Sequence, residues 1–401
     1  MELNREKLPI IYDCLKEYNV DAWLIVGRET AMRSEPILPV LGDLDFIIAT
    51  ALIFTKEGRC IAVVSPLDVE GYKMIAGIDE VIEYPGSFQD TLKEVIAKLN
   101  PPRLALNYSR NDAAGDGLSV GNKMMLDKIF KEINYQGEVI SAHDIIKKVR
   151  GIKTATQIAK IKHCAEVALD YLLRMPSILK EGSTSGDIFR FLQDETAFKD
   201  GYGMSWAPSQ CPGVSVDPNV PQGHMGLIDT PVVKGCVINI DYGVSKDGYC
   251  SDLQRMYYVL KDDESEAPAE VVRAFNTVRD AILMAKEALR PGVTGYDVDK
   301  VARSHIVSEG YDSWNAALGH QVGHVTHDGG TILANRRPRY NRPELIDVPL
   351  DEGNVFTLEP GVEIPQGRVG IEEMAVITSD GAEFLVPPQQ EIICVRLKKG
   401  D

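Results

Sequence analysis

The sequence predicts two domains of different class, an α/β domain over residues 1–150 and an α+β domain over residues 151–401. Three observations lead to this prediction. A chain of 401 residues is too long for one ordinary domain. Strand-like and helix-like segments alternate in the first part, whereas the second part groups long amphipathic helices with strands joined by Gly-containing turns. With 44% apolar residues, the chain can fill two cores.

The N-terminal elements follow from apolar spacing and from turn residues. Helical spacing predicts helices over 7–18 and 92–99. Short apolar runs predict strands over 23–26, 47–54, 60–64 and 104–107. The two middle strands flank Lys56-Glu57-Gly58, which predicts a hairpin. This part has no Gly-rich phosphate loop and no cluster of His and acidic residues, so its sequence assigns it no function.

The C-terminal part begins with a long amphipathic pattern. Apolar residues at a period near 3.6 predict helices over 156–173, 185–198 and 271–289. Runs rich in β-branched and aromatic residues predict strands over 237–244, 250–260, 355–364 and 371–377. Helices grouped with antiparallel strands indicate α+β packing for residues 151–401.

Charge and cysteine content exclude several classes of partner. The formal net charge of −16 disfavours nucleic acid and anionic membranes, which need clustered Lys and Arg. The N-terminus lacks the pattern of a signal peptide, and no apolar run approaches the ~20 residues of a membrane-spanning helix. The seven cysteines are scattered and never spaced as CxxC, which is typical of reduced thiols. We therefore expect a cytoplasmic protein.

One predicted hairpin carries two aspartates. Residues 236–260 read CVINIDYGVSKDGYCSDLQRMYYVL, and a turn over 245–248 separates two β-rich runs. Paired residues of a hairpin have a constant sum of numbers, so Asp241 and Asp252 are expected to face each other, give or take a bulge. Like charges directly opposite destabilise a sheet. Such a pair requires a protonated carboxyl, screening by water or a bridging cation.

A second predicted hairpin repeats the arrangement with glutamates. Residues 354–378 read NVFTLEPGVEIPQGRVGIEEMAVIT, with the turn at Pro365-Gln366-Gly367. The same pairing rule places Glu359 opposite Glu372, among neighbours apolar enough to be buried. Four buried carboxylates without cations would largely have to protonate. Glu363 and Glu373 fall outside the pairing and are expected to be surface charges.

Between the two hairpins lies GHQVGHVTHDGG, residues 319–330, which holds three of the seven histidines. An imidazole beside several carboxylates suits Mn, Co, Zn or Fe(II) better than Mg or Ca. Four carboxylates and one His exceed the needs of one ion, whereas two bridged ions would use all five. Two such ions can activate a water and stabilise the attacking and leaving oxygens, which indicates hydrolysis. His143, His163 and His305 are interpreted as structural.

With these motifs in order, residues 151–401 resemble the pita-bread metallopeptidases, which include methionine aminopeptidase, proline aminopeptidase and prolidase. The two-domain layout is similar to the creatinase and proline-peptidase branch, whose N-terminal domain is α/β. The resemblance implies roles for five metal ligands: Asp241 binds one ion, Asp252 bridges both, His320 in GHQVG is a ligand, Glu359 in EPG binds the other ion and moves the proton of the attacking water, and Glu372 in GIEE bridges.

The resemblance also implies that His224 and His327 contact the substrate and stabilise the tetrahedral intermediate. The activity it implies is a dinuclear metallopeptidase that hydrolyses short peptides at the N-terminal residue, next to proline, by attack of a metal-bridging hydroxide. Two divalent ions are expected, manganese ahead of cobalt, zinc or iron. A homodimer is expected by resemblance alone.

Four positions depart from the pattern of the proline-specific enzymes: Ala316, His324, Asp328 and Gly370. None belongs to the metal set, and all concern the substrate, although Arg368 lies close to Gly370 in sequence. A second hypothesis therefore stays open, a metal-dependent hydrolase or lyase of the same fold acting on a small non-peptide substrate, such as a creatinase-like amidinohydrolase or a zwitterion lyase. A third is a non-enzymatic binding protein, which the five intact ligands disfavour.

Overall fold

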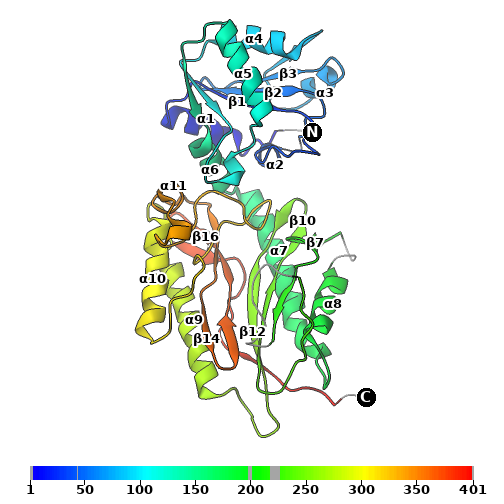
Figure 1. Cartoon of the computed structure of the whole chain (residues 1–401), viewed down its shortest axis with the longest axis vertical. Coiled ribbons are helices and arrows are strands. Elements are labelled where there is room, and N and C mark those ends of the chain that lie inside the picture. The colour runs from blue at the N-terminus through cyan, green and yellow to red at the C-terminus, as the bar shows by residue number, and fades with distance from the viewer. Residues whose placement is uncertain (1–2, 43, 197–200, 217–225, 400–401) are drawn as a thin grey trace. The chain divides into compact units, whose positions relative to one another are not determined.

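The structure is a computed structural model that describes residues 3–42, 44–196, 201–216 and 226–399. The chain divides into two compact units, Met1–Gly151 and Ile152–Asp401. Figure 1 shows the elements of each unit. Within the described ranges, no helix combines the length and the apolar character needed to cross a lipid bilayer.

The first unit is built on one six-stranded mixed sheet. Its strands lie in the order β4 (Glu80–Glu83), β3 (Cys60–Val64), β2 (Thr50–Thr55), β1 (Ala22–Gly27), β5 (Arg103–Leu106) and β6 (Glu138–Ser141). Strand β2 is antiparallel to β1 and β3, and the remaining pairs are parallel. The hairpin predicted around Lys56-Glu57-Gly58 is confirmed, because β2 and β3 pair there.

Helices cover both faces of this sheet. They are α1 (Leu8–Glu17), α2 (Leu38–Leu41), α3 (Val69–Lys73), α4 (Phe88–Leu99), α5 (Val120–Glu132) and α6 (His143–Gly151), with a short 3-10 turn over Ala113–Gly115. Side chains alternate along β1, so Trp23 and Ile25 join the core under α1 and α6, while Leu24 and Val26 join the core under α4 and α5. The two helices predicted here are confirmed as α1 and α4.

The second unit packs two pairs of long helices around several antiparallel ribbons. Its helices are α7 (Ala155–Arg174), α8 (Ser185–Thr196), α9 (Ala269–Ala288), α10 (Gly295–Ser308) and α11 (Pro343–Ile346), with 3-10 turns over Met175–Ile178 and Pro338–Tyr340. Its strands are β7 (Gly203–Met204), β8 (Gly213–Ser215), β9 (Val237–Tyr242), β10 (Val244–Lys246), β11 (Tyr249–Cys250), β12 (Leu253–Val259), β13 (Val355–Leu358), β14 (Gly361–Ile364), β15 (Gly367–Gly370), β16 (Glu373–Ile377), β17 (Ala382–Phe384) and β18 (Ile393–Val395).

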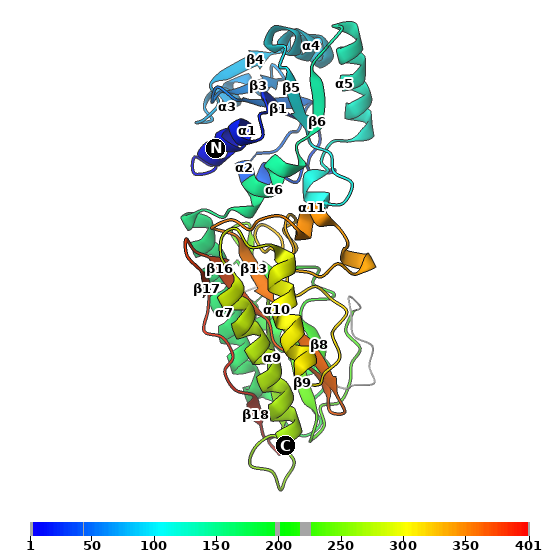
Figure 2. The ribbon, with the colours of Figure 1, turned by 90° about the vertical axis from the view of Figure 1, so that its left-hand side faces the viewer.

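The ribbons lie between the helix pairs. Figure 1 shows α9 and α10 on one side of the strands and α7 and α8 on the other, and Figure 2 shows α9 and α10 side by side. Every residue of β12 is buried, because its alternate side chains enter two different cores. Tyr257 joins the core that contains α7 and α8, and Tyr258 joins the core that contains α9 and α10. The α+β class predicted for this part is confirmed.

The predicted long strands are interrupted in the structure. The run over 250–260 is divided between β11 and β12 around Ser251-Asp252, and the run over 355–364 is divided between β13 and β14 at Glu359-Pro360. Strand-like character therefore extends further in the sequence than regular strand does in the structure. The breaks fall at Asp252 and Glu359, two of the residues predicted to be metal ligands. The backbone of both residues therefore lies outside the regular strands.

Candidate metal centre

The first hairpin has a different register from the predicted one. Asp241 pairs with Gln254 rather than with Asp252. The cause is the turn: Asp247 and Gly248 both have positive φ, 50° and 75°, and form a two-residue loop between Lys246 and Tyr249. The turn is therefore centred one residue later than predicted. Asp252 lies two residues before Gln254, so it is the diagonal neighbour of Asp241 on the same face.

The second hairpin has the predicted register. Gly361 pairs with Gly370 on the turn side, and Leu358 pairs with Glu373 on the other side. All these pairs share one sum of residue numbers, and Pro365-Gln366 forms the loop. Glu359 and Glu372 lie between the two paired segments, at positions that oppose each other in this register.

Gln254 joins the two hairpins. Its backbone forms an antiparallel bridge with Glu372, with N–O distances of 3.3 Å in both directions. Its side-chain Nε2 donates to Glu372 Oε2 at 2.9 Å. Because Gln254 also pairs with Asp241, one residue brings an acid from each hairpin together. Asn239 supports the same junction by donating from Nδ2 to the carbonyl oxygen of Gly370 at 2.8 Å.

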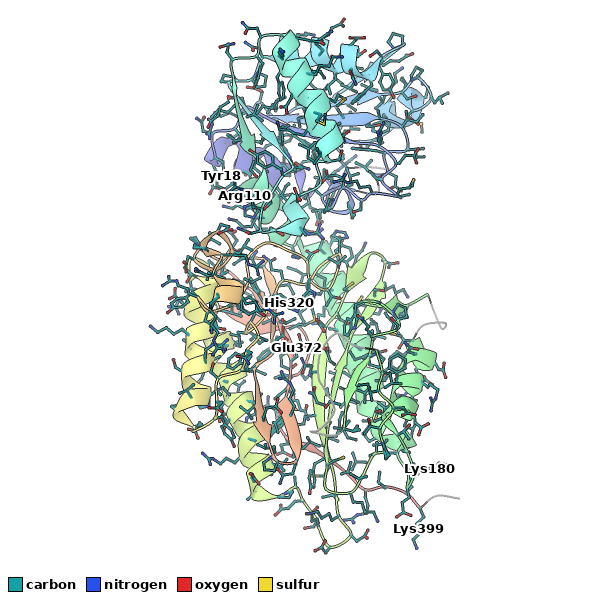
Figure 3. All side chains as sticks on the ribbon, viewed as in Figure 1. Tyr18, Arg110, Lys180, His320, Glu372 and Lys399 are labelled. Atoms are coloured by element: carbon teal, nitrogen blue, oxygen red, sulfur yellow. The ribbon has the colours of Figure 1, made fainter. Side chains whose placement is uncertain are left out.

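His320 enters this junction from the loop before the second hairpin. Thr357 fixes its backbone twice, by accepting from His320 N at Oγ1 at 3.1 Å and by donating its own N–H to His320 O at 2.9 Å. The ring atom Nε2 lies 3.4 Å from Glu359 Oε1 and 3.6 Å from Asp252 Oδ2. Figure 3 shows His320 and Glu372 close together among the strands of the second unit.

Burial and crowding make this group unfavourable without a cation. Burial, followed by the neighbouring Glu372 and Asp241, raises the pKa of Asp252 well above its ordinary value. Burial and Asp241 raise the pKa of Glu359 to about 8. Burial and Glu359 also raise the pKa of Glu372 well above the ordinary value. The carboxylate forms are thus penalised, as expected for like charges that share a dry site.

The donor set fits a metal ion. Ligand atoms of Asp252, His320 and Glu372 all lie within 4.8 Å of one another, the single such group among the described residues. Asp252 Oδ1 and Glu372 Oε1 are buried and accept no hydrogen bond. Burial lowers the pKa of His320 to about 3, so its imidazole is neutral and can donate a lone pair. Buried oxygens without donors beside a neutral imidazole match the ligand preferences of Mn, Fe(II), Co or Zn.

The other predicted site residues differ in how they are related to Asp252, His320 and Glu372. The charges of Asp241 and Glu359 act on the buried acids, and Glu359 lies beside the His320 ring. His327 is exposed, and its ring centre is 4.2 Å from that of His320. His224 lies outside the described residues.

The sequence interpretation of Glu373 is wrong. This residue is 1% exposed and forms a 3.0 Å ion pair with Arg255, which is equally buried. Arg255 also donates from Nη1 to the carbonyl oxygen of Glu372 at 3.1 Å, so the pair holds the backbone of a candidate ligand. The position of Glu373 in the sequence could have indicated its burial. Successive residues of a strand point to opposite faces, and both faces are buried at Glu372 and Glu373. Glu363 is exposed, as predicted.

Comparison with known proteins gives consistent similarities over both units. The sequence profile of metallopeptidase family M24 matches residues 159–379, more than half of the chain. The Xaa-Pro dipeptidase of Pyrococcus horikoshii is 27% identical over 379 residues, which cover 90% of this chain and 99% of that protein.

Two solved structures have the same fold. The Xaa-Pro dipeptidase from Bacillus anthracis matches with a TM-score of 0.70 at 22% identity, covering 97% of this chain and 99% of that one. The X-Pro aminopeptidase from Thermotoga maritima MSB8 matches with a TM-score of 0.68 at 25% identity, covering 94% of this chain and 98% of that one. The predicted pita-bread fold with a smaller N-terminal α/β part is confirmed.

Proposed function

Because the chain belongs to metallopeptidase family M24, we propose that it hydrolyses short peptides at a site where Asp241, Asp252, His320, Glu359 and Glu372 hold two divalent ions. One observation carries this proposal: Asp252 and Glu372 bring buried oxygens without hydrogen-bond donors to within reach of a neutral His320. Manganese is proposed ahead of cobalt, zinc or iron, because carboxylate oxygens outnumber the single imidazole nitrogen in this donor set.

The bound ions would supply Lewis acidity, which lowers the pKa of water and polarises a peptide carbonyl. Glu359 is the proposed proton carrier. A carboxyl group beside the ions can accept a proton from the attacking water and return it to the leaving amine. Thr357 Oγ1 donates to Glu359 Oε1 at 3.2 Å and so fixes the direction of that carboxyl.

Histidines complete the proposed chemistry. His327 is exposed to an incoming substrate and lies against the His320 ring. An imidazole N–H there can donate to an oxygen that becomes negative in the transition state. His224 is proposed for the same task on the strength of the resemblance alone.

The substrate proposed is a short peptide with proline after its first residue. Relatives across both units carry the names Xaa-Pro dipeptidase and X-Pro aminopeptidase. Within the protein, Arg368 supports a substrate with an anionic end, because its guanidinium lies over the paired glycines Gly361 and Gly370. A Cβ atom at Gly361 would be 2.9 Å from Arg368 Nη2, and one at Gly370 would be 3.5 Å from Nε. A cytoplasmic location and a homodimer complete the proposal; none of the seven cysteines forms a disulfide.

The second candidate function is a metal-dependent hydrolase or lyase acting on a small non-peptide substrate. Gly370 favours it, because the arginine that the resemblance implies there is replaced by a residue without a side chain. This change alters the surroundings of the substrate and leaves the five ligands in place.

Metal analysis combined with a substrate panel tests the proposal. The protein is purified without chelator, and its Mn, Fe, Co and Zn are measured per chain, with about two ions expected. Release of proline is then measured with Xaa-Pro dipeptides, release of free amino acids with dipeptides that lack proline, and release of urea with creatine. Two ions with proline release support the peptidase, whereas two ions without cleavage of any peptide favour the second candidate. A chain that binds no metal contradicts both.

A further inference from the structure

A buried lysine contacts the loop that carries the two site histidines. Lys153 precedes α7, and its backbone N–H donates to the carbonyl oxygen of Gly353 at 2.9 Å. Its ammonium Nζ lies 3.0 Å from Gln321 Oε1 and 3.0 Å from Asp328 Oδ2. The side chains of Lys153 and Asp328 are 3% and 1% exposed.

The two partners of Lys153 each follow a histidine of the site. Gln321 is the residue after His320, and Asp328 is the residue after His327. The backbone closes the loop between them, since Asp328 N donates to Gln321 O at 2.9 Å. The Lys153 ammonium therefore contacts both residues that directly follow the site histidines in the chain.

The loop is shaped to admit this ion pair. Gly323 lies under it: a Cβ atom there would be 2.1 Å from Asp328 Oδ2 and 3.0 Å from Lys153 Cε. Gly323 also contacts the first hairpin, because its carbonyl oxygen accepts from Cys250 N at 2.9 Å. The loop 321–328 is thus hydrogen-bonded to the first hairpin, and its Gln321 and Asp328 side chains both contact the Lys153 ammonium.

Stability alone does not account for this arrangement. Desolvating an ammonium and a carboxylate is expensive, and buried ion pairs can often be replaced by neutral residues of similar volume at no net cost in stability. What a neutral pair cannot reproduce is the charge-assisted connection between two fixed points. We therefore expect Lys153 to contribute to the geometry of the site more than to its stability.

We propose that Lys153 is a positioning residue that sets the His327 imidazole against that of His320. His320 has an independent anchor in Thr357, so the loss of Lys153 displaces His327 more than His320. The ring centres, now 4.2 Å apart at an interplanar angle of 65°, would no longer be fixed relative to each other. This inference rests on the proposed function only for its kinetic consequence.

The test uses the full-length double variant Lys153→Met with Asp328→Asn. A single Lys153→Met change leaves a buried carboxylate without its ammonium and can fail to fold. The double variant removes both charges with little change of volume, so its thermal unfolding temperature is expected to stay near that of the original protein. Ile161→Ala, in the buried core of α7, is the matched control, because it destabilises the unit and leaves the Lys153–Asp328 ion pair in place.

Two measurements decide the question. In the metal-free protein with isotope-labelled histidine, the ring resonances of His327 are expected to shift or broaden in the double variant, those of His320 to move less, and both to stay in place in Ile161→Ala. In the metal-loaded enzyme, kcat is expected to fall by about 10- to 100-fold, with metal affinity and KM changed less than about threefold.

A double variant that folds and keeps both sets of resonances overturns the inference, whatever the enzyme's substrate is. So does a variant whose His320 and metal affinity change while His327 does not. If the original protein cleaves no peptide, the proposed function fails separately, and the resonances still report whether Lys153 positions His327.

Discussion

Gln254 and Glu372 are 118 positions apart in the sequence, yet they share two backbone hydrogen bonds and one between their side chains. Gln254 Nε2 donates to Glu372 Oε2 at 2.9 Å, so Oε1 is the oxygen of this carboxyl without a hydrogen-bond donor. Gln254 therefore sets the orientation in which this carboxyl would meet a cation. Hydrogen bonds of this kind around metal ligands fix their orientation.

Replacing Gln254 by leucine is expected to weaken metal binding and activity by about 10- to 100-fold without unfolding the chain, because Glu372 loses the donor that orients it. Titration with Mn under chelator competition measures the affinity. Gln390→Leu, at an exposed position, is the control. Unchanged affinity in Gln254→Leu would show that the backbone bridge alone positions Glu372.

Neutralising a candidate ligand is expected to have opposite effects with and without metal. Asp252→Asn and Glu372→Gln should each abolish activity and reduce bound metal. Without metal at pH 8, each variant should be more stable than the original protein by roughly 1–3 kcal/mol, because one crowded buried carboxylate is removed. Since the raised pKa penalises only the ionised form, this gain should disappear at pH 4.

Calorimetry of the metal-free proteins at both pH values provides this measurement. Glu363→Gln, an exposed neighbour in sequence, should change neither stability nor metal content. Full turnover in Asp252→Asn would contradict its role as a ligand.

Arg368 is expected to act on substrate affinity. Its guanidinium lies over Gly361 and Gly370, and its charge partly offsets the rise in the pKa of Glu359 that burial and Asp241 cause. Arg368→Ala should raise KM for a dipeptide with a free carboxylate by about tenfold, since a charge-assisted hydrogen bond is lost, and should change KM less for the same dipeptide as its amide. The exposed Arg396→Ala is the control. Equal changes for acid and amide would place the substrate carboxylate elsewhere.

Glu35 gives the first unit a pH dependence of its own. This residue is 4% exposed, Asn107 donates to its Oε1 at 3.0 Å, and its Oε2 is buried without a donor. Burial raises its pKa to about 7. A folded pKa above the unfolded value means that this group's contribution is fully present below about pH 4.5 and is lost as pH rises to about 7.

Glu35→Gln should therefore stabilise the protein at pH 8 by on the order of 3 kcal/mol and have little effect at pH 4. Urea unfolding followed by tryptophan fluorescence measures this, with the exposed Glu94→Gln as the control. A gain that is the same at both pH values would indicate a packing effect rather than a proton.

The sequence predicted those parts of the site that depend on local geometry. The Glu359 and Glu372 positions follow from a short turn at Pro365-Gln366, and the structure has that register. The first hairpin was misjudged because Asp247 and Gly248 both adopt positive φ, which moves the turn centre by one residue. That shift converts direct opposition of the aspartates into a diagonal contact.

The contacts that position the site could not be predicted from the sequence, because they join residues that are far apart in it. Arg255 and Glu373 are 118 positions apart, and Lys153 and Gln321 are 168 apart. Composition and periodicity report which residues are buried, and they do not report which buried residue of one segment meets which residue of another. The partner of Glu373 could not be predicted for this reason, although its burial follows from its place on a buried strand.

The bridge between Gln254 and Glu372 also has a consequence for synthesis of the chain. During translation the first hairpin emerges with only Asp241 and Asp252 of the proposed ligands. Until the second hairpin follows, these two acids are a pair that water can solvate. Capture of the proposed ions would have to wait until more than a hundred further residues have left the ribosome and closed this long-range contact. Acquisition of metal would then report that the C-terminal unit has finished folding.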